Sequence, residues 1–224
     1  VLPALLAGVD PDLVRPLAAR LGQEFEAVML ETRVLAMEAD GLGVAVRLAD
    51  QAGRERTERY DRVLVAVGRR PNTQGLGLDR TRVQVDPRGF VITDAQRRTA
   101  EPAIFAVGDI AGQPMLAHKA THEGKVAVAA LAGRKAAYAP QAVPAVVFTR
   151  PEIAWTGLTE KEALAQGVSI QVSTFPWAAS GRATTLGDCD GVTKLITAKE
   201  SGRGLGLGVA GPGAGELIAE GTLA

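Results

Sequence analysis

The run VLVAVGRRPN at residues 63–72 is the most informative part of the sequence for the fold. Its first five residues are all apolar, which is typical of a strand buried on both faces of a parallel sheet. Gly68 then ends the run, and the missing side chain allows a flat or charged ligand to approach the backbone. Ligands of open α/β sheets lie beyond the carboxyl ends of the strands, so Gly68 and Arg69 are candidate binding residues. An ordinary strand end followed by a turn explains the same letters, because short motifs often match by chance.

A second run of this kind, IFAVGDI at residues 104–110, predicts another buried strand that ends in glycine. Asp109 follows that strand directly, and its carboxylate can accept hydrogen bonds from the hydroxyl groups of a ligand. A helix is predicted over residues 114–131, and its first N–H groups suit a phosphate or an electron-rich ring atom. Asp109 is explained equally well as a turn residue, because aspartate is common in turns.

Hydrophobic spacing in the first part of the chain predicts one helix and several strands. The helix begins at Asp10-Pro11-Asp12, where an N-cap residue precedes a proline at the first helical position, and it ends at Gly22. Strands are predicted at residues 27–37, 44–48 and 54–60, the last as an exposed edge strand.

The composition changes near residues 138–144, where we expect a domain boundary. Beyond it, a capping box at 159–162 predicts the start of a short helix. Alternating apolar residues predict short strands before and after this helix, including one at 205–209. The pattern favours an antiparallel sheet with helices on one side.

Composition excludes several classes of protein. The 224 residues carry 25 Lys+Arg and 25 Asp+Glu, and a net charge of zero argues against a nucleic-acid or anionic-membrane binder. No apolar run approaches the roughly 20 residues of a membrane span, and no secretory signal is visible. We therefore expect a soluble, cytoplasmic protein with no nucleic-acid or membrane partner. Because Val1 opens the chain and the helix predicted near its end has no cap, we also expect a fragment.

In this order, the two strand ends resemble those of the flavoprotein disulfide reductases. Within that family, the residues at 114–120, 147–154 and 175–183 resemble the dihydrolipoyl dehydrogenases, and the series covers nearly the whole chain. A reductase of the mercuric or glutathione type is the nearest alternative. A dimerisation module without chemistry is an alternative from another class.

The resemblance implies an oxidoreductase that uses FAD and NAD. Electrons would pass from a dihydrolipoyl group through a redox disulfide and FAD to NAD+. The fold implied is α/β plus α+β: the later part of a Rossmann-like NAD domain at 1–72, a central segment of the FAD domain at 73–140, and an antiparallel-sheet dimerisation domain at 141–224. The implied partners are a second copy, through residues 141–224, and the lipoyl domain of a 2-oxo acid dehydrogenase complex.

The resemblance also implies which residues lie against the cofactors. Asp109 would hold the ribityl chain of the flavin, and Val34 would lie near the adenine of NAD. The others fall into a flavin group, Met115, Leu116, Ala117 and His118, and an NAD group, Ala66, Val67, Gly68 and Arg69.

Three features of the family are missing from the sequence. Neither glycine-rich dinucleotide fingerprint is present, and a pair of redox cysteines is impossible with the one cysteine of the chain. The C-terminal histidine and glutamate of the family would lie beyond Ala224. We therefore expect no catalytic residue here, and the chain alone to be inactive.

His118 and His122 stand four residues apart on the predicted helix, a spacing that can chelate a metal ion. Asp109 and Glu123 are possible further ligands, but a metal site needs three or four that converge. Contact with the flavin explains His118 better, so we expect no metal, and His122 has no assigned role. Cys189 is expected to be a bystander thiol.

Overall fold

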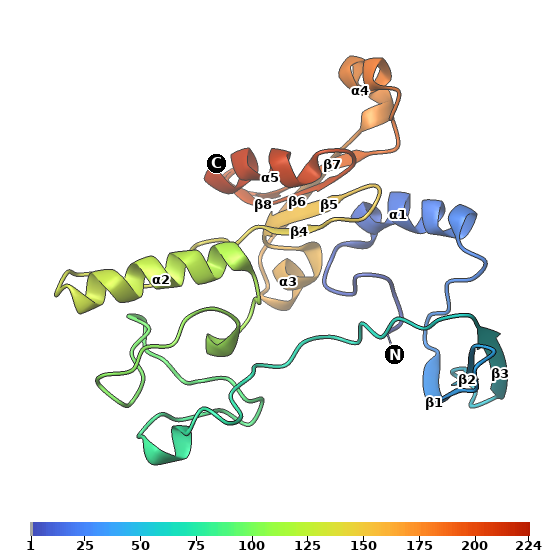
Figure 1. Cartoon of the computed structure of the whole chain (residues 1–224). Helices are drawn as coiled ribbons and strands as arrows, with labels where there is room; N and C mark the ends of the chain where they lie inside the picture. Colours follow the sequence, from blue (N-terminus) through green and yellow to red (C-terminus); the bar gives the residue numbers. More distant parts are fainter. Residues whose placement is uncertain (1) are drawn as a thin grey trace. The chain divides into compact units, whose positions relative to one another are not determined.

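The computed structural model describes residues 2–224 (Figure 1). Its chain divides into two compact units, of which the first joins Val1–Val65 with Pro144–Ala224 and the second is Ala66–Val143. Each helix of the described residues is too short or too polar to cross a bilayer.

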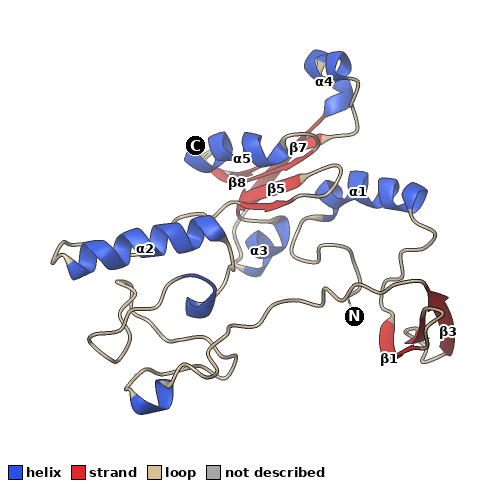
Figure 2. Ribbon diagram, in the orientation of Figure 1, coloured by secondary structure: helices blue, strands red, loops and turns tan. Residues whose placement is uncertain are grey.

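A five-stranded antiparallel sheet organises the first unit, with the strand order β4-β5-β8-β7-β6. Figure 2 shows its strands in red. This sheet confirms the antiparallel arrangement expected for the last part of the chain. Its strands are β4 (Ala145–Val147), β5 (Ile153–Gly157), β6 (Ile170–Pro176), β7 (Val192–Ala198) and β8 (Gly204–Ala210).

Helices cover both faces of this sheet. Ile153 packs into a cluster with Leu13 and Leu17 of α1 (Pro11–Glu24). Its neighbour Ala154 packs with Ile218 of α5 (Ala214–Leu223). Successive residues of a strand point to opposite faces, so α1 and α5 lie on opposite sides. The prediction of helices on one side was wrong, because a helix from the start of the chain covers the second face.

Glycines of β8 allow this close packing. An ideal Cβ at Gly208 would lie 2.2 Å from Cδ1 of Leu13, and one at Gly206 would lie 2.1 Å from the carbonyl oxygen of Leu158. The glycine-rich run GLGLG at residues 204–208 is therefore a strand that the Leu158 backbone and α1 approach closely.

Two short helices also belong to this unit. The capping box predicted at 159–162 is present at the start of α3 (Glu160–Ala165), where Thr159 and Glu162 bond each other's backbone N–H groups. We missed α4 (Gly181–Leu186) and the short turn η3 (Trp177–Ala179) before it. The side chain of Ser180 caps α4, and Gly187 ends it in the left-handed conformation, so the signal was available.

A separate three-stranded antiparallel sheet comes from residues 33–60. The first predicted strand started too early, since residues before Arg33 form no strand. The alternation in the second is confirmed, because Val46 and Leu48 are buried. The third is the exposed edge that its charges predicted. The strands are β1 (Arg33–Ala39), β2 (Val44–Ala49) and β3 (Glu55–Tyr60).

The second unit is built around α2 (Ala117–Leu131), with the short turns η1 (Leu78–Arg80) and η2 (Gly108–Ala111). Neither of the two buried strands predicted in the sequence forms. Leu64 and Val67 are each 92% exposed, and residues 104–107 make a single isolated bridge, at Phe105. A strand needs a hydrogen-bonding neighbour, and residues 2–224 provide none for the first run.

Candidate functional site

The second predicted strand end places Asp109 on a short turn. Asp109 is the second residue of η2, and its side chain is half exposed. Its Oδ2 lies 3.7 Å from Nη1 of Arg69, so the structure brings the two motif ends together within one unit. The carboxylate therefore has acceptor capacity left for a ligand.

The start of α2 is the second part of this candidate site. Leu116 is the N-cap residue, and it provides no side-chain cap. Ala117 begins the helix, Met115 and Leu116 are half buried, and His118 is exposed. A helix start without a side-chain cap favours a negative or electron-rich group at its N–H end.

A buried ionic cluster lies beneath η2. Glu123 is fully buried and accepts hydrogen bonds from the backbone N–H of Gly108 (2.7 Å) and from Nη1 of Arg97 (2.8 Å). Nζ of Lys119 lies 3.1 Å from the same carboxylate. Sequence reasoning missed this cluster. The signal available was a lysine and a glutamate four residues apart on the face of α2 that is buried.

The residues predicted to border NAD lie on exposed backbone. The side chain of Val34 stands on β1 and is 52% exposed, opposite Leu48 of β2. Residues 66–69 form an exposed, extended segment of the second unit. Gly68 has a φ of +122°, and no atom lies within 4 Å of an added Cβ, so its backbone is open to a ligand.

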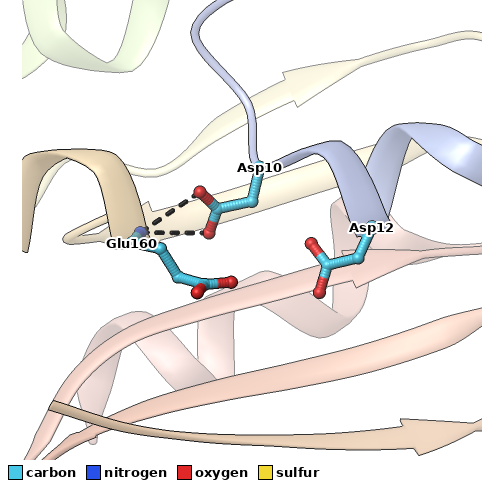
Figure 3. A group of neighbouring side chains, drawn as sticks. All are labelled: Asp10, Asp12 and Glu160. Carbon is cyan, nitrogen blue, oxygen red and sulfur yellow. Dashed lines mark hydrogen bonds between the residues drawn. The ribbon is translucent and has the colours of Figure 1, made fainter.

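Among residues 2–224, neither histidine considered as a metal ligand belongs to a group of three or more ligand atoms that lie close together. His122 instead packs edge-on against Tyr138, with ring centroids 5.1 Å apart. In residues 2–224, three oxygen ligands come close together at one place, formed by Asp10, Asp12 and Glu160 (Figure 3).

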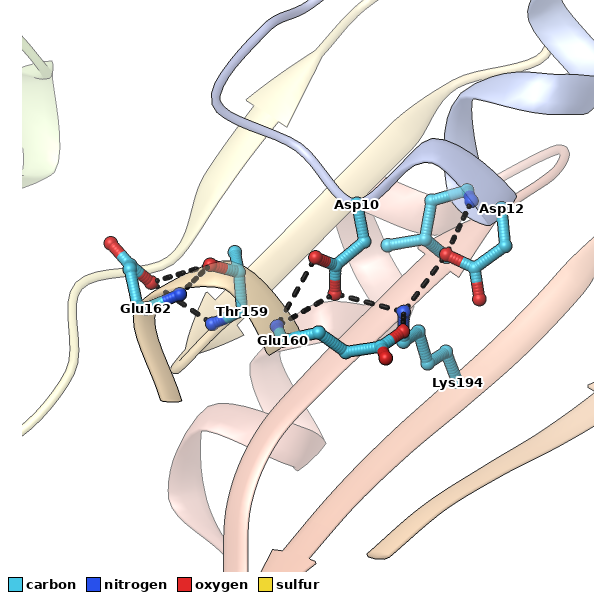
Figure 4. Close-up of polar contacts among 7 residues, drawn as sticks. Asp10, Asp12, Thr159, Glu160, Glu162 and Lys194 are labelled. Atoms are coloured by element: carbon cyan, nitrogen blue, oxygen red, sulfur yellow. Dashed lines mark hydrogen bonds and ion pairs between the residues drawn. The ribbon is translucent and has the colours of Figure 1, made fainter. Parts of the chain in front are cut away.

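The ammonium group of Lys194 occupies the centre of these carboxylates (Figure 4). Its Nζ lies 2.9 Å from Asp10 and 2.9 Å from Asp12, and it pairs with Glu160 as well. Burial alone lowers the pKa of Lys194, but its hydrogen bonds to the three carboxylates outweigh burial and raise the pKa above its ordinary value. The ammonium group of Lys194 therefore occupies the position in which a metal ion would bind.

Asp10 begins one helix but bonds the start of another. It is the N-cap residue of α1, as predicted, but its side chain does not cap that helix. Its two oxygens accept from the backbone N–H of Glu160, at 3.1 and 3.2 Å, at the start of α3. Asp10 thereby fixes α3 to α1.

Cys189 is a free, half-buried thiol. Its Sγ lies 4.0 Å from Oγ1 of Thr184, and it borders an open cavity of about 990 Å³ beside α1. It is the one cysteine of the sequence, so it has no partner for a disulfide within the chain.

Comparison with known protein families identifies the family of this chain. Residues 1–124 match the model of the family described as pyridine nucleotide-disulphide oxidoreductase, and residues 143–224 match that family's dimerisation domain. The chain belongs to the pyridine nucleotide-disulphide oxidoreductases.

Relatives within this oxidoreductase family carry a common name. A dihydrolipoyl dehydrogenase from Vibrio cholerae is 47% identical over 216 residues, which cover 96% of this chain and 45% of the relative. One from Thermus scotoductus is 45% identical over 100% of this chain and 48% of the relative. The chain thus spans about half the length of these relatives.

Two solved structures are similar to this chain in fold. LpdA from Mycobacterium tuberculosis matches with a TM-score of 0.85 and 28% identity, over 96% of this chain and 46% of that one. The HOCl-induced flavoprotein disulfide reductase RclA from Escherichia coli matches with a TM-score of 0.89 and 26% identity, over 99% and 50%. These matches confirm the fold class expected from the sequence.

Proposed function

We propose that this chain is part of a dihydrolipoyl dehydrogenase, an enzyme that oxidises dihydrolipoyl groups and reduces NAD+ by way of a disulfide and FAD. The similarity to relatives of that name supports the assignment. The observation that carries it is the placing of Asp109, half exposed on η2, in the unit whose helix α2 begins without a side-chain cap.

The residues present fit FAD. The Asp109 carboxylate is an acceptor for ribityl hydroxyl groups, and the start of α2 offers backbone N–H groups to the electron-rich edge of a flavin. Met115, Leu116, Ala117 and His118 would lie along the ring. When bound, FAD supplies the two-electron carrier that links a dithiol to a nicotinamide.

For NAD, the open backbone at Gly68 is the supporting feature. We assign Ala66, Val67, Gly68 and Arg69 to the border of the nicotinamide-nucleotide site, and Val34 to the neighbourhood of its adenine. We divide the chain accordingly into an NAD-binding part at 1–72, an FAD-domain segment at 73–140 and a dimerisation part at 141–224.

Dimerisation through residues 141–224 is supported by the family match of this region and by apolar side chains that it exposes. Leu217 of α5 is 49% exposed, Leu195 of β7 is 41% exposed and Phe175 of β6 is 50% exposed. Exposed apolar side chains of this kind suit burial against a second copy. We further propose a lipoyl domain of a 2-oxo acid dehydrogenase complex as the second partner, and a cytoplasmic location.

The substrate distinguishes this proposal from the glutathione- or mercuric-reductase alternatives. We would express the whole protein that carries this chain and compare NAD+ reduction by dihydrolipoamide with NAD(P)H oxidation by glutathione disulfide and by Hg²⁺. Of the three substrates, we expect only dihydrolipoamide to be turned over. Turnover with only glutathione disulfide or Hg²⁺ would reject the proposal.

The 224-residue chain alone should not turn over dihydrolipoamide. A redox disulfide needs two thiols, and the chain has one cysteine. The same assay on the isolated chain tests this, and clear NAD+ reduction would contradict it. A chain that dimerises but whose melting temperature responds to neither FAD nor NAD+ would favour a dimerisation module without chemistry.

A further inference from the structure

We propose that Glu123, Lys119 and Arg97 form a buried positioning cluster that fixes η2 so that Asp109 is preset for the flavin. This inference rests on the proposed function, because it assumes that Asp109 contacts FAD. It adds three residues that touch no cofactor and act through the backbone on either side of Asp109.

The cluster holds the loop at both of its ends. Glu123 accepts from the N–H of Gly108 at 2.7 Å, directly before Asp109. Nζ of Lys119 donates to the carbonyl oxygen of Gly108 at 3.0 Å and to that of Gly112 at 2.8 Å. Side chains of α2 therefore fix the backbone at the first residue of η2 and immediately after its last residue.

The position of the Asp109 carboxylate depends on this backbone. Among the described residues, its carboxylate has one charged neighbour, Arg69, at the loose distance of 3.7 Å. Gly108 adopts a φ of +80°, and an added Cβ would lie 3.2 Å from Cβ of Ala120, so the turn is pressed against α2. The backbone of Gly108, held by its hydrogen bonds to the cluster, therefore sets the direction of the Asp109 side chain.

The charges of the cluster are almost completely shielded from water. The side chains of Glu123 and Lys119 are 0% and 2% exposed, and that of Arg97 is 12% exposed. The guanidinium of Arg97 also lies over the ring of Tyr138, 4.9 Å from its centroid. Removing one member leaves a buried charge without its partner, which is strongly unfavourable, so the three side chains act as a unit.

A double-mutant cycle tests the coupling between the cluster and Asp109. We would prepare the whole protein that carries this chain as wild type, Glu123→Gln, Asp109→Asn and the double variant. FAD is removed, and its dissociation constant is measured by titration of flavin fluorescence, with the visible circular dichroism of bound flavin as a second readout.

We expect Glu123→Gln to weaken FAD binding about tenfold, the usual effect of one buried charged hydrogen bond. If Glu123 acts through Asp109, the double variant binds no more weakly than Asp109→Asn alone, and the circular dichroism changes in the same way. Effects that multiply in the double variant would overturn the inference, as would wild-type affinity in a folded Glu123→Gln protein.

A lysine pair on the same helix provides the control. Lys119→Met removes both carbonyl contacts, whereas Lys125→Met changes an exposed lysine of α2. We expect the first to weaken FAD binding and the second to leave it unchanged. If Glu123→Gln fails to fold, Lys119→Met takes its place in the cycle with the same expectations. Wild-type protein that binds no FAD would reject the proposed function itself. Wild-type FAD affinity in Glu123→Gln and Lys119→Met, together with weaker binding in Asp109→Asn, would reject only this cluster's role.

Discussion

Nζ of Lys194 lies 2.9 Å from a carboxylate oxygen of Asp12, although 182 positions separate the two residues in the sequence. Lys194 also pairs with Asp10 and Glu160, and its side chain is 1% exposed. One ammonium group therefore joins α1, α3 and β7 (Figure 4). This cluster attaches the helix at the start of the chain to the sheet near its end.

Replacing Lys194 with methionine should destabilise the fold. Lys194→Met leaves three neighbouring carboxylates without their cation, and breaking such a buried pair costs about 3 kcal/mol. We expect the free energy of unfolding in a urea titration to fall by an amount of that size, and the midpoint to fall with it. Lys199→Met, at an exposed position just after the same strand, is the matched control and should leave the midpoint unchanged. Equal midpoints for the two variants would refute the role of the cluster.

The same lysine predicts how stability depends on alkaline pH. The carboxylates raise the folded-state pKa of Lys194 above its ordinary value of 10.5. A raised pKa means that the stabilisation is fully present below the unfolded-state pKa and is lost as pH rises through the folded-state pKa. Thermal unfolding from pH 9 upward should therefore converge for wild type and Lys194→Met at the alkaline end. A stability difference that stays constant across this range would contradict the assignment.

Close packing of α1 on β8 predicts the effect of a single methyl group. Gly208→Ala places a Cβ 2.2 Å from Cδ1 of Leu13, so the Leu13 side chain or α1 itself must shift. We expect a loss of about 1–3 kcal/mol in the free energy of unfolding, as for other overpacked cores. Gly204→Ala, in the same strand, meets no atom within 4 Å and should be nearly neutral. Urea unfolding of the two alanine variants measures the difference, and a neutral Gly208→Ala would contradict the tight contact between Leu13 and β8.

The proposed dimer predicts a charge-sensitive surface. Leu217→Glu places a carboxylate on the exposed side of α5, where burial against a second copy would be costly. Sedimentation velocity on the whole protein should show a shift from dimer towards monomer. Leu42→Glu, at an 84% exposed position outside residues 141–224, is the control and should remain dimeric. If both variants stay dimeric, the dimer contact does not include this face of α5.

Local signals predicted the elements that local interactions form. The Asp10-Pro11-Asp12 start of α1 and the capping box of α3 depend on residues within one helical turn, and both lie where expected. Alternation in β2 likewise predicted which residues are buried.

Features that depend on distant residues could not be predicted in this way. The apolar run at 63–67 has strand composition, but strand pairing requires a neighbour that the described residues do not provide. Asp10 has the sequence of a cap, yet its carboxylate binds the start of α3. Glu123 and Lys194 lie in ordinary sequence surroundings, and only the fold shows their partners.

The visible absorbance of the whole purified protein, recorded anaerobically before and after dihydrolipoamide is added, tests the proposed enzyme most directly. We predict flavin bands that decrease when dihydrolipoamide is added and recover when NAD+ follows. A colourless protein, or flavin bands that dihydrolipoamide leaves unchanged, would contradict the assignment.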